Sequence, residues 1–366
     1  MTNISAEDCA AMQDALARLL GQHCTETDVR RVMATSDGYD PGLWRQMAEM
    51  GILGLVTDPE FGGIGAGAVE LELLMEAAGA ALLPSPWFAS GVCAAALLGA
   101  CTDTRVKARL LPEIVAGTKI VTVALASAQG QWAAEHVTVQ AAQGRLNGEA
   151  AYVLYAEEAD VFLVVAKTAD GIGVFEVEAK TPGVTVMAQE SFDRTLRLGR
   201  VVLTDVAGRQ IQCAGVRTVE WMLNMACVGQ AGEQVGAARR IFDITIEYVK
   251  TRVQFGRPVG GFQAIKHMAA DLLLEVESAT SAARAAAGGL ASGNAGQEML
   301  LNLAAFFCKD TFLQVAATAL QMHGGIGFTW EHPCHLYLRR ARAGAQLFGS
   351  PEFYRDRYVA ALEKAA

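Results

Sequence analysis

The sequence predicts an α+β chain in which a helical N-terminal domain, a middle antiparallel β-domain and a helical C-terminal domain follow one another. Two observations predict this class. Apolar residues return every three or four positions up to about residue 118 and again beyond residue 213, which is the period of an amphipathic helix. Between these parts, short runs of Val, Thr and Ile alternate with polar residues, as strands do. The predicted domains are residues 1–118, 119–212 and 213–366.

The N-terminal helices are expected in the stretches DCAAMQDALARLLGQH, LWRQMAEMGILGL and AVELELLMEAAGAALL. The Pro- and Gly-rich segment TDPEFGGIGAG, residues 57–67, is predicted as a loop between the second and third stretches. The segment LPSPW, residues 83–87, ends the third, because Pro lacks the backbone N–H that a helix interior needs.

The strands of the middle domain are expected in short Val-rich runs such as KIVTVALA, VFLVVAKT, GVTVMAQE and RLGRVVLTDV. The connections that we expect between them, for example QGRLNG and TADGIG, have the length of turns. Because such connections leave no room for crossover helices, the sequence favours an antiparallel sheet.

In the C-terminal domain the helical period indicates one long helix over residues 219–251 and further helices at about 263–291 and 296–322. Along the first, Val235, Phe242 and Val249 belong to one apolar stripe. We find no internal repeat and no low-complexity linker.

The amino-acid composition indicates which kinds of binding partner to expect. Hydrophobic residues make up 52% and charged residues 19%, which fits buried subunit interfaces or an apolar ligand pocket. A net charge of -9 argues against nucleic acid and anionic membrane surfaces as partners.

The cysteines and the N-terminus indicate a cytoplasmic protein without a metal site. The eight cysteines are scattered, with no C-x-x-C pair and no His/Cys cluster at metal-ligand spacing. The N-terminal stretch MTNISAEDCAAM has two acids before any apolar run, and no segment reaches about 18 uncharged apolar residues. We therefore expect neither a signal peptide nor a membrane span.

Three stretches resemble signatures of the acyl-CoA dehydrogenase family. YVKTRVQFGRPVGGFQAIKHMAADL, residues 248–272, is similar to the R-x-x-F-G signature, and LQMHGGIGFTWEHP, residues 320–333, to the Q-x-x-G-G-x-G-[FY] signature. LWRQMAEMGILGLVTDPEFGGIG, residues 43–65, resembles the family's N-terminal opening. All three lie in family order and at family spacing, so the resemblance extends over essentially the whole chain and implies a C-terminal four-helix bundle.

The resemblance implies FAD-dependent α,β-dehydrogenation of an acyl-CoA thioester, with electron-transfer flavoprotein as electron acceptor. In the family, the two C-terminal signatures bind the ADP half of FAD from the neighbouring subunit, which implies a dimer or a dimer of dimers. The residues themselves suit a pyrophosphate, because Arg252 is cationic and glycines permit close backbone approach. The expected FAD-binding residues are Arg252, Gln254, Phe255, Gln263, Gln321, Gly324 and Gly325.

The middle domain departs from the family where the flavin ring is covered. The stretch VALASAQGQWAAE, residues 123–135, lacks the family's T-E-P and its closing S-D. Tyr152 stands in place of a Trp, and Leu154 in place of a hydroxyl residue that donates to the flavin. We therefore expect a flavin-ring pocket that is altered, incomplete or unused.

Both family positions for the catalytic carboxylate are also changed. The reaction needs a carboxylate against the substrate α-carbon, and alignment places Phe348 at one position and Ala226 at the other. Neither side chain accepts a proton. The acids that offer a substitute are Glu352, which we prefer, Glu220 and Glu233, whereas Glu331 and Asp271 are expected to have structural roles.

The sequence leaves three functions open. The tail LFGSPEFYRDRY, residues 347–358, is similar to the tails of bacterial subunits that form α2β2 dehydrogenases for steroid-type or other bulky CoA thioesters, in which a partner supplies the catalytic Glu. A self-sufficient homotetramer with a relocated base is the second possibility, and a non-catalytic CoA-ligand-binding scaffold the third. Met222, Met225 and Ala226 are small or flat side chains that would enlarge an acyl cavity.

Overall fold

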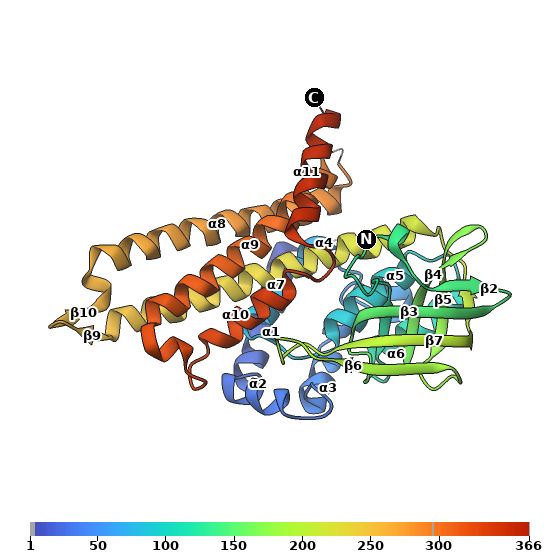
Figure 1. The fold of residues 1–366 in the computed structure, drawn as a ribbon, viewed down its shortest axis with the longest axis horizontal. Coiled ribbons are helices and arrows are strands. Elements are labelled where there is room, and N and C mark those ends of the chain that lie inside the picture. Colours follow the sequence, from blue (N-terminus) through green and yellow to red (C-terminus); the bar gives the residue numbers. More distant parts are fainter. Residues whose placement is uncertain (1–3, 295, 366) are drawn as a thin grey trace.

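The computed structural model describes residues 4–294 and 296–365. It confirms the predicted fold class: in Figure 1 the long C-terminal helices lie on the left, the sheet lies on the right, and N-terminal helices pack below and between them. The strands run from β1 to β8 between two helical parts, so the expected boundaries near residues 118 and 213 fall between α6 and β1 and between β8 and α7.

Helices dominate the N-terminal part. Polar side chains cap the N-termini of the first two helices. The Ser5 hydroxyl accepts a hydrogen bond from the Asp8 N–H, and Thr25 and Asp28 form a reciprocal capping box. The predicted loop at residues 57–67 contains one short 3-10 helix, Pro59–Phe61. The α-helices are α1 (Ala6–His23), α2 (Glu26–Met33), α3 (Pro41–Glu49), α4 (Ala68–Ala80), α5 (Ala95–Gly99) and α6 (Thr104–Val115), with a π-helical segment, Phe88–Ala94, leading into α5.

The middle part is one sheet with the strand order β6-β7-β3-β2-β4-β5-β8, and β1 pairs with β4. Its strands are β1 (Val121–Ala124), β2 (Gln140–Ala142), β3 (Arg145–Leu154), β4 (Val161–Thr168), β5 (Gly171–Glu178), β6 (Val184–Gln189), β7 (Leu198–Ala207) and β8 (Arg209–Ile211). The expectation of a purely antiparallel sheet is wrong in one place, because β4 pairs in parallel with β1 and with β2. The β2–β3 hairpin and a short 3-10 helix, Ala134–His136, lie between β1 and β4 in the chain, so the crossover is made without an α-helix.

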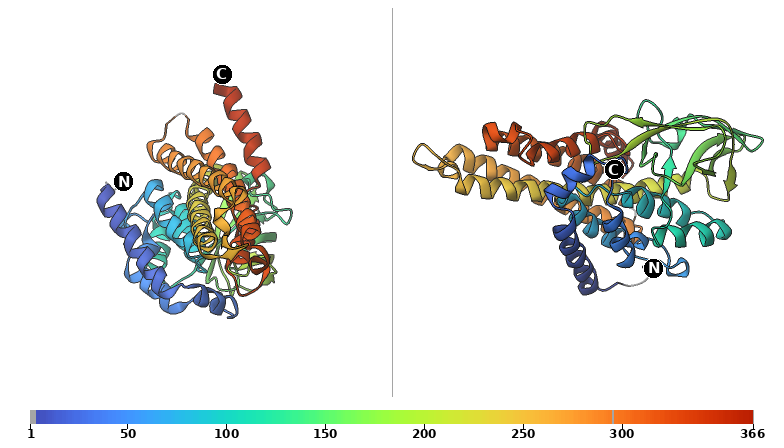
Figure 2. Two further views of the ribbon diagram at one scale, coloured as in Figure 1. Left: turned by 90° about the vertical axis from the view of Figure 1, so that its left-hand side faces the viewer. Right: turned by 90° about the horizontal axis from the view of Figure 1, so that it is seen from below.

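The C-terminal part consists of helices, of which the first three were predicted to within three residues at each end and the last two were not predicted. They are α7 (Val216–Thr251), α8 (Gln263–Ser292), α9 (Gln297–His323), α10 (Cys334–Gly344) and α11 (Pro351–Ala365). A small hairpin, β9 (Val253–Gln254) and β10 (Arg257–Pro258), joins α7 to α8. The long helices α7, α8 and α9 run side by side, and the end-on view in Figure 2 shows them bundled together.

Helix α7 connects the two large cores of the molecule. Met225 and Val228 belong to the core that unites the N-terminal helices with the C-terminal bundle. Val219, Met222 and Ala226 belong to the core formed by the sheet, α5 and α6, which also contains Phe348. The stretch of α7 around residue 226 therefore lies where all three parts of the chain meet.

Small residues let α4 cross α7 closely. A Cβ built on Gly79 would lie 1.9 Å from the Glu233 carbonyl oxygen, and one built on Gly232 would lie 2.3 Å from the Glu72 carbonyl oxygen. No side chain fits at such distances, so these glycines fix the spacing of the two helices.

One helical stretch, residues 297–328, is long and apolar enough by composition to cross a membrane. Its most apolar 18-residue window is 56% buried inside the fold, as in the core helix of a bundle.

Candidate active site

Phe348, at one of the two expected base positions, is wedged into the junction of the three parts of the chain. Only 3% of the residue is exposed. Its ring lies 4.7 Å from the Trp132 ring and 5.5 Å from the Phe88 ring, in edge or tilted contacts that aromatic pairs favour. Ala226, at the other base position, is fully buried in the same core. Both positions are thus occupied by packed apolar groups.

The backbone of Phe348 is held in an unusual conformation by two buried side chains. Its φ of 60° lies in the left-handed region, which costs energy for a non-glycine residue. The Tyr354 hydroxyl donates to the Phe348 carbonyl oxygen. The Lys309 ammonium donates to the carbonyl oxygens of the two flanking residues, Leu347, at 2.9 Å, and Gly349. These bonds fix the direction in which the ring points.

Lys309 is an unusual cation, because only 2% of the residue is exposed. Burial lowers its pKa to about 8, since the charged form is desolvated. Its ammonium also lies 5.0 Å from the centre of the Tyr354 ring. A lysine inside the apolar stretch NLAAFFCKDTFLQV of α9 was a signal in the sequence that we did not use.

Two cavities meet at Phe348. The larger, about 300 Å³, lies between α7, α9, α11 and the loop after Trp132, and Glu220, Asn224 and Arg357 contribute polar groups to it. The smaller, about 10 Å³, is lined by Tyr152, Leu154 and Met222 among others. Phe348 and Trp132 line both cavities, and the smaller one is too small to hold an acyl group.

The three candidate substitute bases occupy different environments. Glu220 lines the larger cavity and is exposed. Glu233 is paired with Arg340, whose guanidinium also binds Asp193 at 2.6 Å, so this carboxylate belongs to a nearly buried ion-pair network. Arg340 itself is 2% exposed.

Glu352, the preferred substitute in the sequence analysis, lies in the first turn of α11 with 74% of its side chain exposed. Hydrogen bonds from its own backbone N–H and from the Ser350 hydroxyl lower its pKa. Arg355 lies 3.8 Å away. Its carboxylate is therefore a solvated anion at the surface of the helix, away from the packed ring of Phe348.

The segment that departs from the family's flavin loop is closed on itself. The Ser127 N–H donates to the Gln131 carbonyl oxygen at 3.0 Å, which forms a tight turn. After this turn, the Trp132 indole N–H donates to the Gln346 carbonyl oxygen at 3.2 Å. Trp132, which follows this turn, therefore packs against the loop that carries Phe348.

At the positions where the family has its Trp and hydroxyl residue, Tyr152 has a left-handed φ of 53°, and its N–H donates to the Gln189 side chain at 2.6 Å. Leu154 is 6% exposed and offers no side-chain donor.

The seven expected FAD-binding residues gather at the far end of the C-terminal bundle, at the left of Figure 1. The chain there passes from α7 through the β9–β10 hairpin into α8, and the end of α9 lies beside it. The Tyr248 hydroxyl donates to the His323 carbonyl oxygen at 3.2 Å, and the two rings stack at 4.4 Å, which ties α7 to α9. The residues are Arg252, Gln254, Phe255, Gln263, Gln321, Gly324 and Gly325, and all are exposed.

This end of the bundle also presents apolar side chains to solvent. Phe255 is 91% exposed and Phe328 is 73% exposed. Val253, Ile326 and Trp330 are between 46% and 55% exposed. Gly324 has a positive φ of 62° with open space where a Cβ would be, so the backbone can be approached closely there. A surface of this kind is typical of a binding interface.

Beneath this surface the structure brings together His323, His332 and Cys334, whose ligand atoms lie within 4.8 Å of one another. Their spacing along the chain did not predict this group. The His323 Nδ1 lies 2.8 Å from the Ala319 carbonyl oxygen and 3.2 Å from the Cys334 sulfur. Burial lowers the pKa of the His323 and His332 imidazoles, which favours their neutral form.

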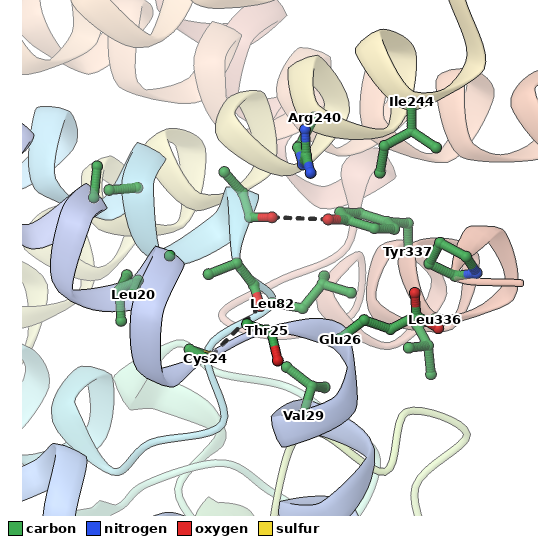
Figure 3. Close-up of a pocket in the computed structure, with 16 residues that line it drawn as sticks. Leu20, Cys24, Thr25, Glu26, Val29, Leu82, Arg240, Ile244, Leu336 and Tyr337 are labelled. Atoms are coloured by element: carbon green, nitrogen blue, oxygen red, sulfur yellow. Dashed lines mark hydrogen bonds between the residues drawn. The ribbon is translucent and has the colours of Figure 1, made fainter. Parts of the chain in front are cut away.

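A third cavity, about 390 Å³, lies away from these residues between α1, α2, α4, α7 and α10 (Figure 3). The Tyr337 hydroxyl, at its edge, donates to the Ala80 carbonyl oxygen at 2.8 Å. Its walls are mostly apolar, with Arg240 and Glu26 as charged lining residues. It contains none of the residues expected to bind FAD or to act as a base.

Comparisons with known proteins agree with the whole layout. A family model described as the acyl-CoA dehydrogenase N-terminal domain matches residues 6–118, and one described as the C-terminal domain matches residues 214–362. The acyl-CoA dehydrogenase IpdE2 of Mycolicibacterium smegmatis is 32% identical over 349 residues, which cover 94% of this chain and 96% of that protein.

Two solved structures are similar over almost their full length. The ChsE4-ChsE5 complex from Mycobacterium tuberculosis contains a chain with a TM-score of 0.91 and 28% identity, and the match covers 100% of this chain and 99% of that one. A variant of the steroid ACAD Tcur3481-Tcur3483 has a TM-score of 0.90 and 29% identity, and the match covers 98% of both chains.

Proposed function

Because the chain belongs to the acyl-CoA dehydrogenase family, we propose that it is one subunit of a heteromeric acyl-CoA dehydrogenase. In this proposal the chain supplies the surface that binds the ADP half of FAD, and a second, unlike subunit supplies the catalytic Glu. The substrate is a steroid-type or other bulky acyl-CoA thioester, the assembly is α2β2, and the compartment is the cytoplasm.

The observation that carries the proposal is the packed ring of Phe348. The cavity that Phe348 shares with Tyr152 and Leu154 is only about 10 Å³, far below the roughly 300 Å³ of a typical ligand pocket. Trp132 and Phe88 hold the ring from two sides, and Lys309 and Tyr354 fix its backbone. A site filled in this way favours chemistry in the partner subunit.

The exposed end of the bundle fits the other half of the proposal. Arg252 offers a cation for a pyrophosphate, and the open backbone at Gly324 and Gly325 permits close approach. Gln263 and Gln321 add amide groups. When bound, FAD supplies the hydride acceptor, and the exposed Phe255 packs against the subunit that carries the flavin ring.

The flavin-ring side of this chain does not fit the group in the same way. Leu154 has no donor, and the turn at Ser127 directs Trp132 into the protein. A division between unlike subunits requires a chain that keeps one half of the FAD site and has lost the other half. The exposed end of the bundle and the filled pocket at Phe348 fit that requirement. The relatives support such a division, since the ChsE4-ChsE5 structure is of a complex and Tcur3481-Tcur3483 is a steroid ACAD.

A self-sufficient enzyme with a relocated base is the second candidate. Glu220 favours it, because this carboxylate lines the 300 Å³ cavity that Phe348 closes at its inner end. In both candidates electron-transfer flavoprotein takes the electrons, as the family resemblance implies.

The test is to express the chain alone and together with any second acyl-CoA dehydrogenase gene that lies beside it in the genome. We expect the lone chain to lack full FAD occupancy and turnover, and the co-purified complex to be yellow and to bleach on addition of a steroid-type acyl-CoA. Full occupancy and turnover from the lone chain would defeat the heteromer proposal and favour the second candidate. A complex whose FAD no acyl-CoA bleaches would favour a non-catalytic scaffold.

A further inference from the structure

The segment after α5 is hydrogen-bonded to the segment before α7 through one carbonyl group. The Gln212 carbonyl oxygen accepts the Thr102 N–H at 2.9 Å and the Asp103 N–H at 3.3 Å. The Thr102 hydroxyl donates to the same oxygen at 3.2 Å. Because Cys101 precedes Thr102 and Cys213 follows Gln212, these bonds hold the two cysteines as close neighbours.

The two side chains contact each other and differ in exposure. The Cys101 and Cys213 thiols lie within interaction distance, so Cys101 can donate a hydrogen bond to a Cys213 thiolate. Cys101 is 2% exposed, and its thiol also lies 3.2 Å from the Leu97 carbonyl oxygen. Cys213 is half-buried and is flanked by the exposed residues Gln212 and Ala214. A reagent from solvent therefore reaches Cys213 first.

The surroundings favour the thiolate form of Cys213. The hydrogen bond from Cys101 is the main cause that lowers its pKa to about 6, with further bonds from the Gly215 N–H and the Thr218 hydroxyl. The residue also precedes the N-terminus of the long helix α7, where a negative charge is stabilised. The pKa of Cys101 is raised by the same hydrogen bond, and Asp103 and Lys107 are the charged groups near it.

We propose that Cys101 and Cys213 form a redox-active dithiol that closes to an intramolecular disulfide when it reacts with a hydroperoxide. The Cys213 thiolate attacks the terminal peroxide oxygen and the O–O bond breaks, so Cys213 becomes a sulfenic acid and the other oxygen leaves as an alcohol, or as water from hydrogen peroxide, after it takes a proton from solvent. The Cys101 sulfur then attacks the Cys213 sulfur, and hydroxide leaves with the Cys101 proton as water. Two thiols are oxidised by two electrons, and one hydroperoxide is reduced.

The disulfide would join the N-terminal helices to the start of α7. The loop that it closes contains the whole sheet, so the bond would limit how the three parts of the chain move relative to one another. Met222 and Ala226, which lie beside Phe348, follow on the same helix. The proposal does not depend on the heteromer described above.

Six other cysteines offer a comparison within the same chain. Burial raises the pKa of each, so their thiols are protonated and shielded. They are Cys9, Cys24, Cys93, Cys227, Cys308 and Cys334. We therefore expect peroxide to select the Cys213 site.

The experiment treats the full-length reduced protein with stoichiometric hydrogen peroxide, blocks free thiols and maps peptides by mass spectrometry without reductant. We expect a Cys101–Cys213 cross-linked peptide, lighter by two hydrogens, that dithiothreitol separates. In Cys101→Ser, dimedone should trap a sulfenic acid at Cys213. In Cys213→Ser, peroxide consumption should fall at least tenfold, whereas the matched buried control Cys93→Ser should behave as the wild type.

A disulfide at other positions, or a sulfinic acid at Cys213 with Cys101 still free, would overturn the proposal. A second measurement uses only the wild-type protein. The rate of alkylation of Cys213 by iodoacetamide should reach half its maximum near pH 6. Equal alkylation of all cysteines at that pH would count against the proposal even if the variants do not fold.

Discussion

The Phe348 ring contacts the Trp132 ring at 4.7 Å between centroids and an interplanar angle of 45°. Trp132 comes from the turn that we align with the family's flavin-covering loop, and Phe348 stands at a position where we expected a base. The two departures from the family pattern therefore form one structural feature, because the two rings pack against each other. We therefore expect this contact to contribute to the stability of the chain.

Phe348→Ala should destabilise the protein by about 3 to 5 kcal/mol, because a buried aromatic side chain is removed from a core that cannot fully collapse. Urea unfolding followed by circular dichroism measures this change. The matched control is Phe255→Ala: that ring is 91% exposed, so its removal should change the free energy of unfolding by less than about 0.5 kcal/mol. Equal effects of the two substitutions would show that Phe348 is not packed as described.

Lys309→Met should destabilise the protein at pH 7, because two carbonyl oxygens beside Phe348 lose their donor. Buried unpaired acceptors cost about 1 to 3 kcal/mol each, and removal of a buried charge offsets part of that cost. The net loss should be about 1 to 3 kcal/mol. A variant as stable as the wild type would mean that these bonds do not support the loop.

The same lysine predicts a pH dependence with a definite sign. Burial lowers the pKa of Lys309 from 10.5 to about 8. Between these values the unfolded chain binds more protons than the folded chain, so this group makes stability rise with pH across that window, by at most about 1.4 kcal/mol per pH unit. Measured as the difference in unfolding free energy between wild type and Lys309→Met, the rise should begin above pH 8. A flat difference from pH 7 to pH 10 would contradict it.

Arg252→Ala should weaken FAD binding by the assembled complex at least tenfold, since a charge-assisted contact to pyrophosphate contributes about 1.4 kcal/mol or more. Flavin fluorescence after dilution measures the affinity. Lys250→Ala is the control, because Lys250 is also exposed and pairs with Glu247 of its own helix. Both variants should keep the melting temperature of the chain. A similar loss of FAD in both would indicate a general charge effect.

Most of the fold could be predicted from the sequence because its helices are set by local periodicity. The start of α8 and the end of α9 lie within one residue of the expected positions. The parallel pairing of β1 with β4 could not be predicted in this way, since Val121 and Val161 are partners only once a hairpin has folded between them. Strand order is a long-range property, and the turn lengths on which we relied report only neighbouring strands.

For the candidate site, the sequence predicted the residue types but not the contacts between them. The absence of a carboxylate at Phe348 is visible in the sequence, but the contact that replaces it is not, because the Trp132 indole bonds a residue 214 positions away. Tyr354, the Cys101–Cys213 pair and the contacts of Lys309 were missed for the same reason, although Lys309 itself was visible as a lysine inside an apolar stretch. Each of them gains its role only from a group brought near by the tertiary structure.

Gly79→Ala should destabilise the protein by several kcal/mol, or prevent folding, because the new methyl group would lie 1.9 Å from the Glu233 carbonyl oxygen. Gly21→Ala is the control: its Cβ meets nothing within 4 Å, and Ala in a helix interior adds about 0.5 to 1 kcal/mol of stability. Opposite signs in urea unfolding are expected. A tolerated Gly79→Ala would mean that α4 and α7 are farther apart than described.

Glu352→Gln and Glu220→Gln, made separately in the assembled complex, distinguish a borrowed base from a relocated one. Removal of a base costs at least about 10² in rate. Glu352 is a solvated anion beside Arg355, and Glu220 lines a cavity whose inner end Phe348 closes, so both variants should keep turnover within about threefold, well short of that loss. In the proposed heteromer, substitution of the catalytic carboxylate of the second subunit should abolish turnover while FAD remains bound. If Glu220→Gln alone loses two orders of magnitude in kcat with substrate affinity unchanged, the base lies in this chain, and Phe348 would have to move aside when substrate binds.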